Sequence, residues 1–261
     1  MNQDQVKQQL LAIEEAPLEF SVIFSGKRSK KVNGLYKPES REIIIHNRNF
    51  TDDNLMMYTA IHEYAHHLHA CQKGGKLGSR SHTAEFWAIL HGLLQKAEAA
   101  GIYKNVFSSS PELEELTTLI RRHYIYENGN LIKELGKHLL RAQQLCQEIG
   151  GRFEDYVDRV LCLPRTAAKM AMKMYQYNLN PSIGAENMKI IAGIKNEEQR
   201  MAAESALLSG KSPDEVKVQL ARKPVEADPR ERLAREKQRL ERTIQTLQKR
   251  LEEIEQELET V

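Results

Sequence analysis

Cysteine is scarce in this chain of 261 residues, and none of it lies in a C-x-x-C pair. The three cysteines are Cys71, Cys146 and Cys162. This odd, scattered set argues against a disulfide framework and a cysteine zinc site, and it favours a reducing compartment. The sequence also lacks the apolar core of a signal peptide and any apolar run long enough to span a membrane. We therefore expect a cytoplasmic protein that makes no use of a membrane.

An excess of charge of either sign is missing as well. Charged residues make up 28% of the chain, yet the formal net charge is only +2. Any binding of nucleic acid must then depend on a local basic patch rather than on attraction by the whole protein. Hydrophobic residues, at 41%, are numerous enough for a packed core, and the length allows two small domains.

The most informative stretch, residues 62–66, reads H-E-Y-A-H and matches the pattern H-E-x-x-H. The apolar run before it favours a helix, in which positions i and i+4 face the same side. His62 and His66 can therefore reach one metal ion. In this pattern the glutamate deprotonates a water that the zinc ion has made more acidic. Glu63 is the predicted catalytic residue, and Zn²⁺ is the predicted cofactor.

A zinc site of this kind needs a third protein ligand. His69 lies on the same face as His62 but about 10 Å further along the axis, too far for one ion to bind both. His67 points away from the pair, and we expect both His67 and His69 to face solvent or to line the cleft. His82, which opens the next predicted helix, is the predicted third ligand. Glu85, one turn further, is the reserve ligand or a hydrogen-bond partner of a ligating histidine.

H-E-x-x-H, followed by a short loop and by H-x-x-E-F-W from His82 onwards, resembles the SprT-like metallopeptidases. The resemblance covers roughly the first hundred residues. It implies a zincin-like fold, hydrolysis of a protein or peptide substrate, a zinc ion held by His62, His66 and His82, and Glu63 as the general base. No zinc-ribbon cysteines follow, unlike in some members, so the resemblance does not imply DNA contact through such a module.

Short β-branched runs before the metal-binding stretch predict a small mixed sheet. The expected elements are a helix at 3–15 and strands at 20–24, 34–37 and 41–46. A sheet edge beside a zinc cleft could hold an extended peptide by strand addition. Residues 1–127 are thus predicted to be an α+β domain built around the H-E-x-x-H helix, whose start Thr51 or Asp52 could cap.

Helical patterns prevail beyond a turn predicted at 128–130, and we predict a helical domain from 128 to 222. Residues 153–171 read as a short helix, a tight turn and a second helix. The second helix carries Arg165, Lys169 and Lys173 at four-residue steps, a basic stripe that could enter a DNA major groove. The segment loosely resembles the helix-turn-helix of phage and plasmid DNA-binding proteins, including ParB-like ones, and that resemblance implies DNA binding. A helical bundle with a solvated basic face is the alternative.

Residues 228–261 carry apolar side chains in alternating steps of four and three. They are Leu240, Ile244, Leu247, Leu251, Ile254, Leu258 and Val261. Such an a/d pattern predicts a coiled coil and, through it, a homodimer. An antiparallel pair of helices, or a helix that docks on its own chain, remains open.

Two functions therefore compete. The first is a zinc metallopeptidase, which the helical domain could localise on DNA and in which Tyr58, Tyr64 or His69 would supply a further oxyanion donor. The second is a dimeric DNA-binding regulator or partition-like protein with a non-catalytic zincin domain. A helical middle that recognises a protein partner is a third, weaker reading.

Overall fold

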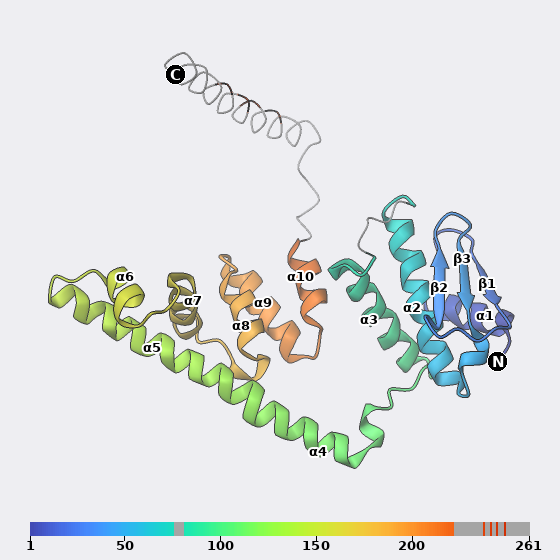
Figure 1. Cartoon of the computed structure of the whole chain (residues 1–261), viewed down its shortest axis with the longest axis horizontal. Helices are drawn as coiled ribbons and strands as arrows, with labels where there is room; N and C mark the ends of the chain where they lie inside the picture. The colour runs from blue at the N-terminus through green and yellow to red at the C-terminus, as the bar shows by residue number, and fades with distance from the viewer. Residues whose placement is uncertain (76–80, 222–236, 238–240, 242–243, 245–247, 249–261) are drawn as a thin grey trace. The chain divides into compact units, whose positions relative to one another are not determined.

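The protein is a mixed α+β structure, mostly helical, with one small three-stranded sheet (Figure 1). The computed structural model describes residues 1–75 and 81–221 and, beyond these, positions 237, 241, 244 and 248. Residues Met1–Leu220 form one compact unit and residues Ala221–Val261 a second. Among the residues so described, no helix is long and apolar enough to cross a membrane.

The sheet is formed by β1 (Ser21–Phe24), β2 (Gly34–Lys37) and β3 (Glu42–Ile45). Its strand order is β1-β3-β2, with β1 parallel and β2 antiparallel to the central strand β3. The prediction of a small mixed sheet is confirmed, with strands slightly shorter than expected. Ile43 and Ile45 of the central strand are fully buried, as alternation in a half-buried strand requires.

Three helices complete the first core. They are α1 (Gln3–Ile13), α2 (Asp53–Gln72) and α3 (Ala84–Ala99), and a short 3₁₀ turn, Asn47–Asn49, leads from β3 towards α2. Asp52, one of the two predicted caps, accepts hydrogen bonds from the first turn of α2. The apolar stripe of α1 is buried as its spacing predicts. Helix α2 packs against α1, α3 and the strands β2 and β3, so 13 of its 20 residues are buried.

A long helical segment follows a short 3₁₀ turn, Phe107–Ser109. It consists of α4 (Pro111–Leu119), the π-helical stretch η3 (Ile120–Tyr126) and α5 (Glu127–Glu148), with no break between them. The turn predicted at 128–130 is therefore wrong. Gly129 lies inside the helix, where a Cβ would be only 2.8 Å from the carbonyl oxygen of Pro181. Close packing, rather than a turn, requires that glycine.

The remaining elements pack against α5 and against one another. They are α6 (Phe153–Asp155), the π-helical turn η4 (Tyr156–Val160), α7 (Arg165–Gln176), the 3₁₀ turn η5 (Pro181–Ile183), α8 (Ala185–Ala192), α9 (Glu197–Leu208) and α10 (Pro213–Ala221). Residues 181–192 thus form a 3₁₀ turn followed by a short helix. Gly136 of α5 allows the closest contact, since a Cβ there would lie 2.0 Å from the carbonyl oxygen of Ala171 in α7.

The buried apolar residues form separate clusters. One cluster draws on α1–α3 and the sheet, and two smaller ones draw on α5 and the helices after it. The predicted boundary between residues 127 and 128 falls within the continuous helical segment, and the three domain limits stay predictions. The coiled coil predicted at 228–261, and the homodimer that would depend on it, lie outside the described residues apart from isolated positions.

Candidate metal centre

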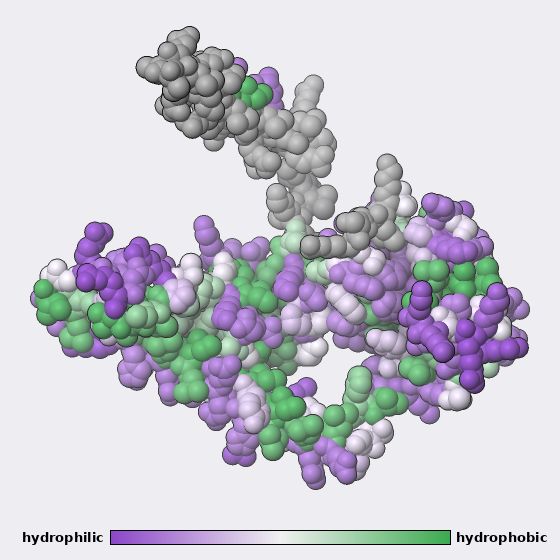
Figure 2. Space-filling view, viewed as in Figure 1, coloured by the Kyte–Doolittle hydropathy of each residue, from purple (hydrophilic) through white to green (hydrophobic). Residues whose placement is uncertain are grey.

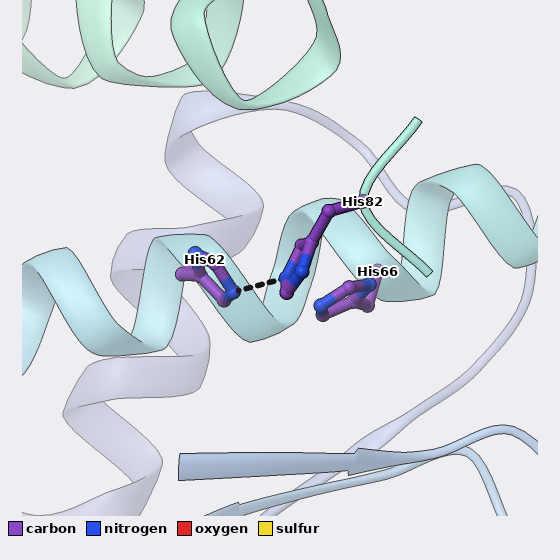
Figure 3. A group of neighbouring side chains, drawn as sticks. All are labelled: His62, His66 and His82. Carbon is purple, nitrogen blue, oxygen red and sulfur yellow. Dashed lines mark hydrogen bonds between the residues drawn. The ribbon is translucent and has the colours of Figure 1, made fainter. Parts of the chain in front are cut away.

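Three imidazole rings converge on one point between α2 and the segment before α3. His62 and His66 come from α2, one turn apart, and His82 comes from the residues just before the helix (Figure 3). One nitrogen from each ring lies within 4.8 Å of the others, so the three residues could hold a metal ion. His82 precedes the N-cap residue Thr83, rather than opening the helix as the sequence had suggested.

One nitrogen–nitrogen distance in the cluster matches the spacing around a tetrahedral ion. The Nε2 atoms of His62 and His82 are 3.2 Å apart. Two nitrogens that bind one tetrahedral zinc ion at its usual bond length lie about 3.3 Å apart. The ring centroids form a nearly equilateral triangle, with sides of 5.1, 5.2 and 5.0 Å. The fold therefore brings the three predicted ligands together. Zinc as the metal stays a prediction from the type of ligand.

Aromatic side chains from the first turn of α3 hold the three rings in place. Phe86 is fully buried and stacks on His66 with centroids 4.2 Å apart. Trp87 stacks on His82 at 5.5 Å. The H-x-x-E-F-W pattern thus supplies one ligand and, one turn later, the apolar wall that orients the ligands. The sequence contained these two aromatics, but it did not reveal this role.

Burial favours the neutral form of His62 and His66, and a neutral ring is the form that binds a metal. Burial, with smaller contributions from His62, His82 and His69, lowers the pKa of His66 to about 3. Burial and the neighbouring His82 also lower the pKa of His62. Protons consequently compete weakly for these two ligand nitrogens at neutral pH.

Glu63 lies beside the ligands and is only 7% exposed. Burial raises its pKa to about 7, against a smaller opposing effect of a hydrogen bond from the backbone of Tyr36. The edge strand β2 reaches it directly, since a Cβ on Gly34 would lie 2.9 Å from Cγ and 3.0 Å from Oε1 of Glu63. Glycine at position 34 therefore lets the strand approach the carboxylate, a contact that the sequence pattern did not indicate.

Neither His67 nor His69 faces solvent, because both side chains are buried, and a place for either in the lining of the cleft stays a prediction. His67 donates from Nε2 to the carbonyl oxygen of Leu18 and accepts at Nδ1 from the hydroxyl of Tyr36, both at 3.0 Å. His69 is 3% exposed, and its ring nitrogens have no hydrogen-bond partner among the described residues. Solvent exposure was expected because histidine is polar. Other elements cover α2 on most of its sides, and the sequence of the helix alone does not show this.

Two further candidates have other partners. Glu85 does not belong to the metal cluster and forms an exposed ion pair with Lys73, with Nζ and Oε1 3.6 Å apart. The reserve-ligand role is therefore not seen in this arrangement. The hydroxyl of Tyr64 donates to the carbonyl oxygen of Glu14 at 2.7 Å, which removes it from the candidate oxyanion donors.

The predicted basic stripe lies on α7, whose buried face includes Ala168 and Met172. Lys169 is exposed and Lys173 is half-buried. Arg165 is bound by Asp158, with a distance of 2.6 Å from Nε to Oδ2. The short helix, turn and second helix are present, whereas DNA contact by this stripe stays a prediction.

Comparisons of the chain with protein-family models, with curated proteins and with solved structures found no match. The site is therefore characterised by its geometry alone, as three imidazoles close enough to hold one metal ion, with a buried carboxylate beside them. The likeness to SprT-like enzymes rests on the residues themselves and stays a prediction.

Proposed function

We propose that the protein is a zinc-dependent metallopeptidase that hydrolyses peptide bonds in a protein substrate. The observation that carries the proposal is the convergence of His62, His66 and His82 with Glu63 next to them. Three neutral imidazoles are a typical ligand set of catalytic zinc, which keeps one position open for water or substrate. A purely structural zinc site is usually closed by a fourth protein ligand, and the cluster found among the described residues contains three.

When bound, the zinc ion would supply Lewis acidity towards a water molecule and a peptide carbonyl. The chain supplies the proton transfer. Glu63 accepts a proton from the attacking water at a carboxylate oxygen and then donates it to the departing amine nitrogen. Its raised pKa suits both halves of this task near neutral pH, because the group exchanges its proton readily there.

The edge strand β2 supplies a binding surface for an extended substrate. Within the described part of the chain, β2 pairs with a strand on one side only, with β3, so its other edge has no partner strand. Gly34 of this strand contacts Glu63, and Leu35 is 47% exposed. A peptide that pairs with β2 would therefore lie next to the general base, as strand addition predicts.

The decisive experiment compares Glu63→Gln with the unchanged full-length protein on an unfolded, fluorescently labelled casein substrate with added zinc. We expect zinc binding to persist and hydrolysis to fall by about 10²–10⁴-fold, the usual contribution of a general base. Glu85→Gln is the matched control, because it neutralises a neighbouring exposed carboxylate outside the metal cluster. Equal hydrolysis by Glu63→Gln and by the protein without the substitution would refute the proposal. Failure of the protein without the substitution to bind zinc would also refute it.

A further inference from the structure

A second concave site lies in the helical region, away from the histidine cluster in sequence. Its volume is about 680 Å³, and it lies between η3 and the segments around η5, α9 and the start of α10. This volume is within the range of sites that bind ligands in proteins. Four of the residues that line it come from η3, namely Arg121, Arg122, Ile125 and Tyr126. We call it the η3 cleft.

The charge of the η3 cleft has one sign. Arg121, Arg122 and Lys211 line it, and no aspartate or glutamate does. None of these three cations forms an ion pair with any residue that the structure describes. By contrast, Arg165 and Lys217 elsewhere in the helical region each pair with an aspartate. The lining of the cleft thus carries three cations and no acid, and two acids, Glu114 and Glu115, line an adjoining hollow with Arg122.

Apolar side chains line the same cleft. Ile125, Tyr126 and Leu208 are 37, 40 and 49% exposed, although each could bury more surface against a partner. Figure 2 shows apolar side chains gathered along the segment that includes α4, η3 and α5, with hydrophilic ones between them. Exposed apolar area that is bordered by charge is characteristic of an interaction site.

The backbone of this wall has an unusual form. Residues 120–126 are π-helical, a conformation that is rare and often marks functional sites. The opposite wall contacts this stretch closely, since a Cβ on Gly184 would lie 2.9 Å from Cγ2 of Ile125. Gly184 also has a φ of +83°, a conformation that glycine adopts readily. The η3 stretch and the segment around η5 are therefore tightly packed at this point.

We propose that the η3 cleft binds an acidic amphipathic helix of a partner protein. Carboxylates of such a helix would face Arg121, Arg122 and Lys211, while its apolar side would cover Ile125 and Leu208. Charge complementarity of this kind directs association and excludes wrong partners. Duplex DNA would satisfy the cations but would leave the apolar side chains uncovered, because its backbone offers phosphates and sugars.

The test uses the full-length protein and a fluorescein-labelled helical peptide of Leu-Glu-Glu-Leu repeats, followed by fluorescence anisotropy. A peptide with lysine in place of glutamate is the control ligand. We expect saturable binding of the acidic peptide only. The double variant Arg121→Glu with Lys211→Glu should weaken binding at least about tenfold, because both positions would then repel the peptide. Leu208→Ala should weaken it several-fold, because apolar contact area is lost.

Matched controls keep the result interpretable. Lys137→Glu makes the same charge change at an exposed position of α5 outside the cleft, and Leu145→Ala makes the same truncation at a 44% exposed leucine of α5. Neither control should change the affinity, and circular dichroism should show all variants folded, because every altered side chain is exposed or half-exposed. Absence of binding, equal affinity of both peptides, or equal losses in cleft and control variants would each overturn the proposal. Displacement of the peptide by a short DNA duplex, with the duplex binding more tightly, would overturn it in favour of a phosphate-binding cleft.

Discussion

Removal of the His82 side chain should abolish tight metal binding and leave the fold intact. His82 is the ligand that comes from outside α2, and its side chain is exposed. His82→Ala would leave His62 and His66 as the remaining imidazole ligands. Loss of a group that merely orients a ligating histidine typically weakens metal binding 10–100-fold. Loss of the ligand itself should exceed this, so we expect a decrease of at least about 100-fold, or about 2.7 kcal/mol.

The affinity can be measured by competition with a chromophoric zinc chelator, and the metal content by mass spectrometry after dialysis. The cost to the fold should stay below about 1 kcal/mol, because an exposed ring that stacks on one tryptophan loses little on truncation. His123→Ala is the control, since it removes an exposed histidine of η3 that is not in the cluster.

Glu85→Ala separates the two candidate third ligands. If His82 binds the ion, Glu85→Ala should keep stoichiometric metal, because its carboxylate is paired with Lys73 outside the cluster. Unchanged zinc affinity in His82→Ala, together with a large loss in Glu85→Ala, would refute the assignment of the third ligand and the geometry on which the peptidase proposal rests.

Three further measurements test the structure. Gly136→Ala should destabilise the helical region by about 3 kcal/mol, because a Cβ 2.0 Å from a backbone carbonyl oxygen must separate two helices. The control Gly92→Ala, with nothing within 4 Å, should stabilise the protein by about 0.5–1 kcal/mol, and equal effects in denaturant melts would contradict this. In metal-free protein, Glu63 has a folded-state pKa of about 7 against an ordinary 4.5, so its ionisation costs stability as pH rises through this window; Glu63→Gln should therefore gain about 3 kcal/mol over the unchanged protein at pH 8 and nothing below pH 4, and a pH-independent difference would contradict the burial argument. Under the DNA-binding hypothesis, Lys169→Ala with Lys173→Ala should lower the salt slope of duplex affinity by about two, and an unchanged slope would exclude this face.

The histidine cluster could be predicted from the sequence because the relation between its members is largely local. His62 and His66 are one helical turn apart, and that spacing alone places both rings on one side. His82 followed from its distance to this helix along the chain and from the motif that it begins. The strands were predictable for a similar reason, since short β-branched runs between turn residues carry their own signal.

The other features depend on which segments meet in the folded chain. The contact of Gly34 with Glu63 joins an edge strand to a helix, and no spacing within either segment indicates it. His67 looked like a solvent-facing residue until Tyr36 and the carbonyl of Leu18 supplied partners from 31 and 49 positions away. A turn was predicted at Gly129 because glycine is common in turns. Its packing partner, Pro181, is distant in sequence, so the sequence did not reveal the packing reason for this glycine.

The absence of a side chain at position 34 has a consequence for any variant of this protein. Because a methyl group is missing here, β2 can approach the carboxylate of Glu63, and any larger residue at this position would push the strand and the carboxylate apart. Under the proposed function, a substitution at position 34 would therefore disturb both the proposed substrate-binding strand and the proposed general base.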